Sequence, residues 1–116
     1  MGLTARAALP DRRPTATVEA DWQGHPITVT VGFYPAGHPR AGAPGEVFAD
    51  TLRGGQMAHT VADACVLVSV ALQHGIAPAD LAKSLGRVPA FVLGAPVLAP
   101  ASPVGAVVQA LVEVAG

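Results

Sequence analysis

The chain has 116 residues, enough for one domain with a single hydrophobic core. Hydrophobic residues make up 51% of it and charged residues only 13%, whereas ordinary soluble domains carry about 25% charged residues. The formal net charge of -1 and the seven scattered Lys and Arg residues argue against a nucleic-acid-binding surface, and no apolar run reaches the roughly 18 residues that a membrane span requires.

A single cysteine cannot form an internal disulfide, which fits the reducing cytoplasm where we expect the protein to reside. No apolar run follows the N-terminal arginines as it would in a signal peptide. Charge is scarcest after Gln56, where the charged residues are Asp63, Asp80, Lys83, Arg87 and Glu113. A monomer would have too little polar surface to cover this half, so we expect a homo-oligomer or docking onto a larger protein.

The first part of the chain predicts a tail followed by three strands. Residues 1–14 have no period and contain two prolines, so we expect a flexible N-terminal tail and a single domain over residues 15–116. Residues 15–22 and 27–34 alternate apolar and polar side chains, and Gln23-Gly24 supplies a turn between them, which predicts an antiparallel hairpin. A loop rich in Gly, Pro and Ala follows, and residues 46–52 alternate again as a third strand.

The segment over residues 53–75 predicts the central helix of the fold. Between residues 65 and 72 it is apolar on every side except at Ser69, whereas an amphipathic surface helix has one apolar stripe. We therefore expect a helix packed on all sides, against the sheet and against further protein. Gly75 ends it, with Ile76 placed for the apolar contact of a Schellman motif.

Two shorter helices and a loop complete the predicted fold. Pro78 and Gly86 bracket a short helix, and Ser102-Pro103 is the cap and first-turn proline of a C-terminal helix. Residues 88–101 contain three prolines, so we predict a packed apolar loop with a short extended piece at residues 91–93. Strands that precede helices indicate an α+β fold, here a three-stranded antiparallel sheet with the central helix and the two shorter helices on one face.

Five runs occur in a consistent order between residues 27 and 112: VTVGFYPAG, GEVFAD, a Gly-Gly helix start, LVSVALQHGI and ASPVGAVVQAL. As an ordered set they resemble the TSCPD-type domain associated with adenosylcobalamin-dependent ribonucleotide reductases. In that family the unit lies near the C-terminus of the reductase and also occurs as a small separate protein. The resemblance implies a link to deoxyribonucleotide synthesis, with a ribonucleotide reductase as the partner.

The chain departs from that family in its cysteines. The Thr-Ser-Cys-Pro-Asp run that names the family is absent from the sequence, and so is a cysteine pair, since Cys65 is the only thiol. Ribonucleotide reduction needs a thiyl-forming cysteine and a reducing dithiol, and the chain has no room for a nucleotide barrel and a cobalamin site. We therefore expect an accessory relative of the reductase that is not catalytic alone and carries no cofactor.

Gly54-Gly55 precedes the predicted start of the central helix. The free N–H groups of a helix start suit an anion such as phosphate, and Arg53 and Gln56 complete this candidate ligand site. The spacing matches neither nucleotide-binding glycine fingerprint. A tight strand-to-helix connection is the simpler explanation for two glycines.

His59 and Asp63 are four residues apart and share one face of the central helix. With Glu46 and Asp50 on the preceding strand they form a candidate catalytic set, in which a carboxylate orients a histidine base. Ordinary pairing of a partly buried histidine with an acid is the simpler explanation. We predict no metal site, because the other three histidines lie in turns without ligand spacing.

Cys65 lies two turns or more inside an apolar helix, so we interpret it as a core residue. A reactive thiolate would need a nearby cation or a helix N-terminus. Trp22 and Tyr34 lie at the ends of the predicted hairpin and could stack a base, although no basic groove accompanies them.

Two classes of function fit these observations. The leading hypothesis is a noncatalytic binding, assembly or regulatory module related to ribonucleotide reductase. The other is a small enzyme or phosphate-ligand-binding protein that uses the Gly54-Gly55 helix start with His59 and Asp63. A purely structural subunit is a third possibility, and it differs from both because it predicts no small-molecule ligand.

Overall fold

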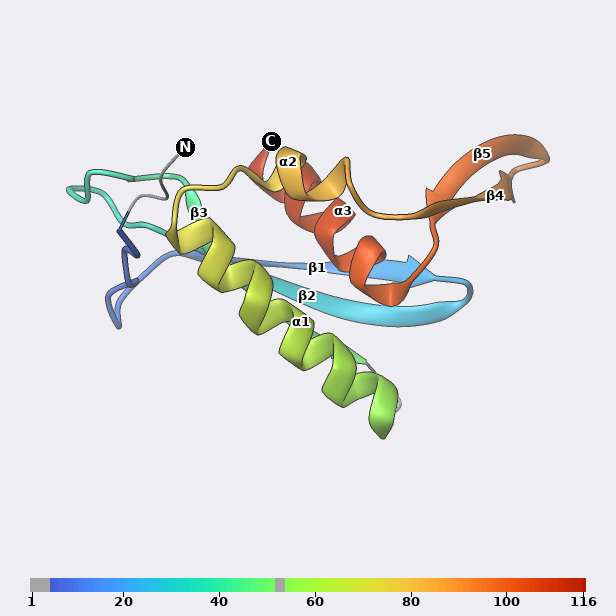
Figure 1. The fold of residues 1–116 in the computed structure, drawn as a ribbon, viewed down its shortest axis with the longest axis horizontal. Helices are drawn as coiled ribbons and strands as arrows, with labels where there is room; N and C mark the ends of the chain where they lie inside the picture. The colour runs from blue at the N-terminus through green and yellow to red at the C-terminus, as the bar shows by residue number, and fades with distance from the viewer. Residues whose placement is uncertain (1–4, 52–53) are drawn as a thin grey trace.

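The computed structural model describes residues 5–51 and 54–116. Its elements in chain order are β1 (Thr15–Trp22), β2 (His25–Phe33), β3 (Pro44–Thr51), α1 (Gln56–Gln73), α2 (Pro78–Ala82), β4 (Arg87–Val92), β5 (Ala95–Pro100) and α3 (Pro103–Ala115). The predicted α+β class and the three-stranded antiparallel sheet are confirmed (Figure 1).

The main sheet has the strand order β1-β2-β3, and its alternating sequence decides which face is buried. Val29 in the central strand pairs with Val18 on one side and Ala49 on the other, so apolar residues line up on one face. The opposite face carries polar side chains such as Thr17 and Thr30, whose hydroxyls lie 3.1 Å apart. The sheet is therefore covered on one side and open on the other.

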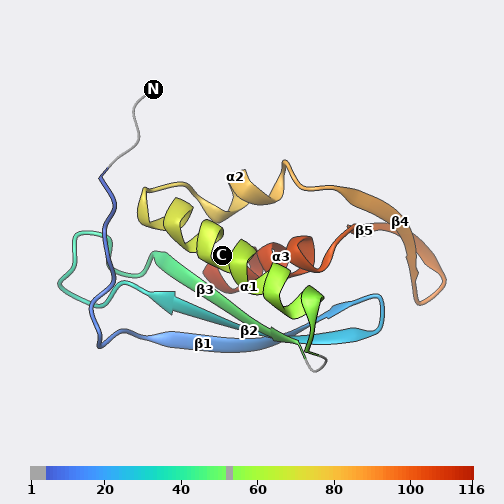
Figure 2. The same ribbon diagram turned by 60° about the horizontal axis from the view of Figure 1, so that its bottom comes forward.

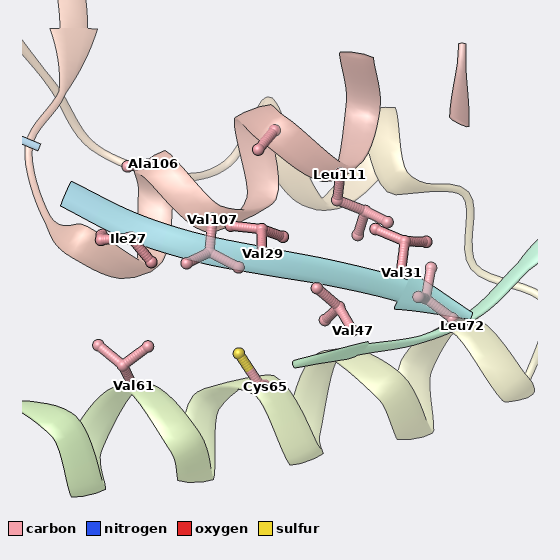
Figure 3. Packing of buried hydrophobic residues seen from close by; sticks show 11 residues of the cluster. Ile27, Val29, Val31, Val47, Val61, Cys65, Leu72, Ala106, Val107 and Leu111 are labelled. Carbon is pink, nitrogen blue, oxygen red and sulfur yellow. The ribbon is translucent and has the colours of Figure 1, made fainter. Parts of the chain in front are cut away.

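Helices α1 and α3 lie side by side on the apolar face of the sheet (Figure 2). Helix α1 runs along β3, α3 crosses β1 and β2, and α2 packs on α3. Between these layers lies the core (Figure 3), whose buried residues are Ile27, Val29, Val31, Val47, Val61, Cys65, Leu72, Ala106, Val107, Ala110 and Leu111.

Helix α1 is buried on its sheet-facing side and exposed on the other. Cys65 and Leu72 are 4% and 3% exposed, whereas Val66 and Leu67 are 60% and 72% exposed. The apolar sequence predicts that protein covers the outer side of α1, but residues 5–51 and 54–116 leave Val66 and Leu67 exposed to solvent there.

The C-terminal end of α1 has the predicted Schellman geometry. Gly75 has φ 92, its N–H donates to Leu72 O at 2.9 Å, and the N–H of Ile76 donates to Ala71 O at 3.1 Å. These are the 5→2 and 6→1 hydrogen bonds of the motif. The left-handed conformation explains why glycine stands there.

The predicted loop over residues 88–101 is wrong, because β4 and β5 form a second, two-stranded antiparallel sheet. Leu93 and Gly94 join the strands with φ 50 and 80, the two positive values of a type I′ hairpin turn. The prolines do not prevent the pairing, because they occupy positions whose N–H would point away from the other strand. The hairpin extends away from the body of the molecule (Figure 1).

Candidate functional site

The predicted anion site lies where the chain passes from β3 into α1. Gly55 is the N-cap of α1 with φ 102, a conformation that favours glycine, and no side chain caps the helix start. A Cβ at Gly54 or Gly55 would meet no atom within 4 Å, so the glycines leave open space. Arg53, the cation predicted for this site, lies outside the described residues.

A hollow of about 410 Å³ lies next to this helix start. Its lining includes Trp22, His25 and Pro26 from the β1–β2 turn, together with Gly54 and Met57. The rings of Trp22 and His25 stack with their centroids 5.8 Å apart. Trp22 Nε1 is buried and has no hydrogen-bond partner among the described residues. The hollow thus combines an aromatic wall with an uncapped helix start, two features that lie far apart in the sequence.

Of the predicted catalytic residues, His59 and Asp63 remain neighbours on α1, but Glu46 is not brought to them. His59 and Asp63 lie on an exposed side of α1, near its start. Glu46 lies near the opposite end of that helix, because Ser69 Oγ accepts a hydrogen bond from the N–H of the adjacent Val47 at 3.0 Å. Ten residues separate His59 from Ser69, which is about 15 Å along a helix. The geometry offers His59 no orienting contact from Glu46.

Glu46 instead forms an ion pair with Arg13. Its side chain is 10% exposed and lies across Gly32, where any Cβ would overlap the carboxyl group. Arg13 also donates to the carbonyl oxygens of Pro10 at 2.8 Å and Asp11 at 3.3 Å. The pair therefore fastens the segment before β1 to the open face of the sheet.

A second polar cluster surrounds Gln73 at the end of α1. Its side chain is buried, accepts a hydrogen bond from Arg6 Nε at 2.6 Å and donates to Gly45 O at 3.0 Å. Its carbonyl oxygen accepts from Arg40 at 2.6 Å and from the N–H of Ala7 at 2.8 Å. Cations suit a helix C-terminus, so the cluster anchors residues 5–14 and the β2–β3 loop to α1.

The sequence pattern does not predict this cluster, although it contains one signal of it. Gln73 is a polar residue at the end of an apolar run, and a buried polar side chain requires partners. What could not be foreseen is that Arg6, 67 residues away, supplies one of them.

Cys65 lies inside the core, as predicted. Burial raises its pKa from 9.0 to about 11, because a thiolate would lose its hydration there. A thiol with a raised pKa is almost entirely protonated at neutral pH, so it is a poor nucleophile and a poor metal ligand.

The aromatic and histidine candidates near the β2–β3 loop form a separate packing group. Tyr34 is 1% exposed, its hydroxyl donates to the Ala7 carbonyl, and its ring stacks on His38 at 4.5 Å between centroids. The Nδ1 of His38 accepts from the N–H of Arg40 at 3.0 Å. A buried Tyr34 cannot stack a base at the surface. Across residues 5–51 and 54–116, no three His, Cys, Asp or Glu side chains gather as metal ligands would.

None of the described helices is both long and apolar enough to cross a membrane. No curated protein and no solved structure matched this chain. A family model did match: that of the TSCPD domain, over residues 4–115. The match extends the resemblance seen between residues 27 and 112 to nearly the whole sequence, including the segment before β1. The chain therefore belongs to the TSCPD domain family.

Proposed function

We propose that this protein is a noncatalytic binding and assembly module linked to ribonucleotide reductase and so to deoxyribonucleotide synthesis. The observation that carries the proposal is the burial of Cys65, the only thiol in a chain of the TSCPD family. Its raised pKa keeps the thiol protonated, so the thiol chemistry of a reductase is left to a partner.

The outer side of α1 is the surface that best suits a larger partner. Val66 and Leu67 are mostly exposed there, and Phe48 of the neighbouring strand is 52% exposed. A groove of about 320 Å³ runs between Phe48 and Val66, beside Leu67, and its lining also includes Asp50, Ala62 and Val70. Apolar side chains with a polar rim are typical of a protein docking site.

Binding to the adenosylcobalamin-dependent ribonucleotide reductase of the same cell tests this proposal. The purified chain is immobilised and titrated with purified reductase, and saturable binding is expected. Leu67→Glu should weaken binding at least tenfold, because it places a charge on the apolar surface. The matched control is Thr17→Glu on the open face of the sheet, which should bind like the unaltered chain. Absence of binding by the folded, unaltered chain would refute the proposal.

A second candidate is a ligand site in the hollow beside the α1 start. The uncapped N–H groups and the Trp22–His25 stack favour a small anion that carries a flat ring, such as a nucleotide. Trp22 is the only tryptophan and lines this hollow, so its fluorescence responds to a ligand bound there. Titration with ADP should change the emission, and His25→Ala should weaken the response. Unchanged emission up to millimolar ADP would remove this candidate.

A further inference from the structure

The β4–β5 hairpin carries apolar side chains on both of its faces. Side chains alternate between the two faces along the paired strands. One face carries Val88, Ala90, Val92, Ala95, Val97 and Ala99, and the other carries Pro89, Phe91, Pro96, Leu98 and Pro100. Arg87 is the only charged residue in either strand. A sheet with one solvent-exposed face has strands that alternate apolar and polar residues. An isolated two-stranded hairpin is at best marginally stable in water. This sequence therefore indicates a hairpin that is covered by protein.

The two faces differ in exposure. Phe91 and Leu98 are 76% and 65% exposed, and Leu93 at the tip is fully exposed, whereas Val88, Val92 and Val97 on the other face are 37%, 56% and 38% exposed. A hollow of about 610 Å³ lies between the hairpin and the body near Trp22 and Gln109, and residues of both hairpin faces line it, Phe91 and Leu98 among them. The face of Phe91 and Leu98, called here the outer face, is thus the larger uncovered surface.

The register shows that the edges of the hairpin are poor sites for another strand. Val92 and Ala95 flank the two-residue turn and form a hydrogen-bonded pair, so their N–H groups point inward. The next residue along each strand away from the turn, and every second residue after it, directs its N–H outward. The bond from the N–H of Ala101 to Gly86 O, 3.0 Å long, fits this register. The outward positions are Arg87, Pro89, Phe91, Pro96, Leu98 and Pro100, and three of these six residues have no N–H.

Proline at outward positions blocks the addition of a strand at a sheet edge. On β5 only Leu98 keeps an outward N–H. Pro89 also interrupts the outward N–H groups of β4 between Arg87 and Phe91. The faces of the hairpin are therefore better suited to a partner than its edges, in the way that two sheets pack face to face about 10 Å apart.

We propose that the partner is a second copy of this chain, and that the outer faces of two hairpins pack against each other about a twofold axis. A twofold interface requires a self-complementary patch, and an apolar face with one charge at its base meets that requirement. If the hairpins run antiparallel, the two Arg87 side chains lie at opposite ends, about 20 Å apart for six residues of strand. The pairing then brings no like charges together.

The exposed area is sufficient for a modest dimer. Large side chains such as Phe91, Leu93 and Leu98 present on the order of 150 Å² each when exposed, and with the prolines this gives about 500 Å² per copy. Two copies would bury about 1,000 Å², which is the lower limit for a specific protein interface. We therefore expect a dimer whose population rises with concentration in the micromolar range. This inference goes beyond the binding of a reductase and does not depend on it.

Sedimentation equilibrium of the purified chain over a hundredfold range of concentration tests the dimer. The unaltered chain should pass from monomer to dimer, and Leu98→Asp should raise the dissociation constant at least tenfold. Leu67→Asp is the matched control, since Leu67 is equally exposed but lies on α1, and it should dimerise normally. A chain that stays monomeric at the highest concentration, or a Leu67→Asp variant that loses the dimer while Leu98→Asp keeps it, would overturn the inference.

Cross-linking locates the interface independently of affinity. In a Cys65→Ala background, a short bis-maleimide cross-linker should join Leu98→Cys chains into a covalent dimer, because facing sheets lie about 10 Å apart, and it should not join Val66→Cys chains. Linkage through Val66→Cys alone would refute the proposed face. Reductase binding is measured separately, so the two proposals can fail independently. A chain that stays monomeric but binds reductase refutes only the dimer. A chain that dimerises but does not bind reductase refutes only the proposed function.

Discussion

At the scale of single residues, Glu46 and Gly32 form a matched pair on the open face of the sheet. Glu46 is a buried carboxylate, and it lies in the space that a larger residue than Gly32 would fill. Arg13 provides the compensating charge from the segment before β1. The sequence around Gly32 or around Glu46 does not predict this pair. The pair depends on the cross-strand register and on Arg13, which lies in a segment without secondary structure.

Arg13→Gln should lower the free energy of unfolding by about 2 kcal/mol, since it leaves a mostly buried carboxylate without its charge partner. This loss of stability is smaller than the loss expected for a fully buried ion pair, because the Arg13 side chain is 25% exposed and solvent screens the interaction. Urea denaturation measures the change. Arg12→Gln, on an exposed neighbour, should change stability by less than about 0.5 kcal/mol, and equal losses in the two variants would contradict the assigned pair.

Cys65 makes a pH-dependent prediction. Its pKa is about 11 in the folded chain against 9.0 for the ordinary thiol, so the unfolded chain ionises first as the pH rises. The contribution of Cys65 to stability is full below pH 9 and is lost between pH 9 and 11. Thermal unfolding of the unaltered chain and of Cys65→Ala measures it, and the difference between them should shrink over that interval. A difference that is constant with pH would contradict the burial of the thiol.

At the scale of elements, Ser69 joins α1 to the open edge of β3. Its Oγ accepts from the N–H of Val47 at 3.0 Å and donates to the same residue's carbonyl oxygen at 3.3 Å. The hydroxyl therefore satisfies backbone groups that the last strand of the sheet would otherwise leave unpaired under a helix. This explains the one polar residue in the apolar run over residues 65–72.

Ser69→Ala should destabilise the fold by about 1 to 2 kcal/mol, because it leaves an N–H and a carbonyl group without partners. Hydrogen exchange at the Val47 amide should also accelerate, whereas amides in α3 should exchange at their usual rate. Ser84→Ala, at an exposed position after α2, serves as the control and should leave both measurements unchanged. Slow exchange at Val47 in the Ser69→Ala variant would refute the assigned role.

The sequence predicted the strands and helix ends that depend only on residues close together in the chain. Strand β1 was predicted over its observed residues 15–22, and the end of α1 at Gly75 follows from the φ that only glycine adopts readily. The β4–β5 hairpin was missed because prolines usually end strands, and their tolerance depends on which edge each N–H would face. That information lies in the pairing register and not in either strand alone.

At the scale of the whole molecule, the candidate site was only partly predictable. The Gly54-Gly55 helix start was identified from sequence, but Trp22 and His25 approach it through the β1–β2 turn, which the sequence places more than 25 residues away. Conversely, Glu46 was grouped with His59 because strand and helix are neighbours in sequence. The antiparallel course of α1 along β3 places the two residues at opposite ends of the helix.

The molecule also presents two separate apolar surfaces, the outer side of α1 and the outer face of the hairpin. Each contains large side chains that are more than half exposed, including Val66 and Leu67 on α1 and Phe91 and Leu98 on the hairpin. Separate surfaces allow two partners to bind at once. A dimer that forms through the hairpins would therefore present two α1 surfaces to a larger assembly.

The prolines of the hairpin have a consequence for newly made chains. Before a partner is found, an apolar β-hairpin resembles the segments that nucleate amyloid, in which strands add edge to edge. Pro96 and Pro100 prevent that growth along β5 while leaving its apolar faces available. Replacing both with valine should produce fibrils that bind thioflavin T, whereas valine at Pro103, in the first turn of α3, should not.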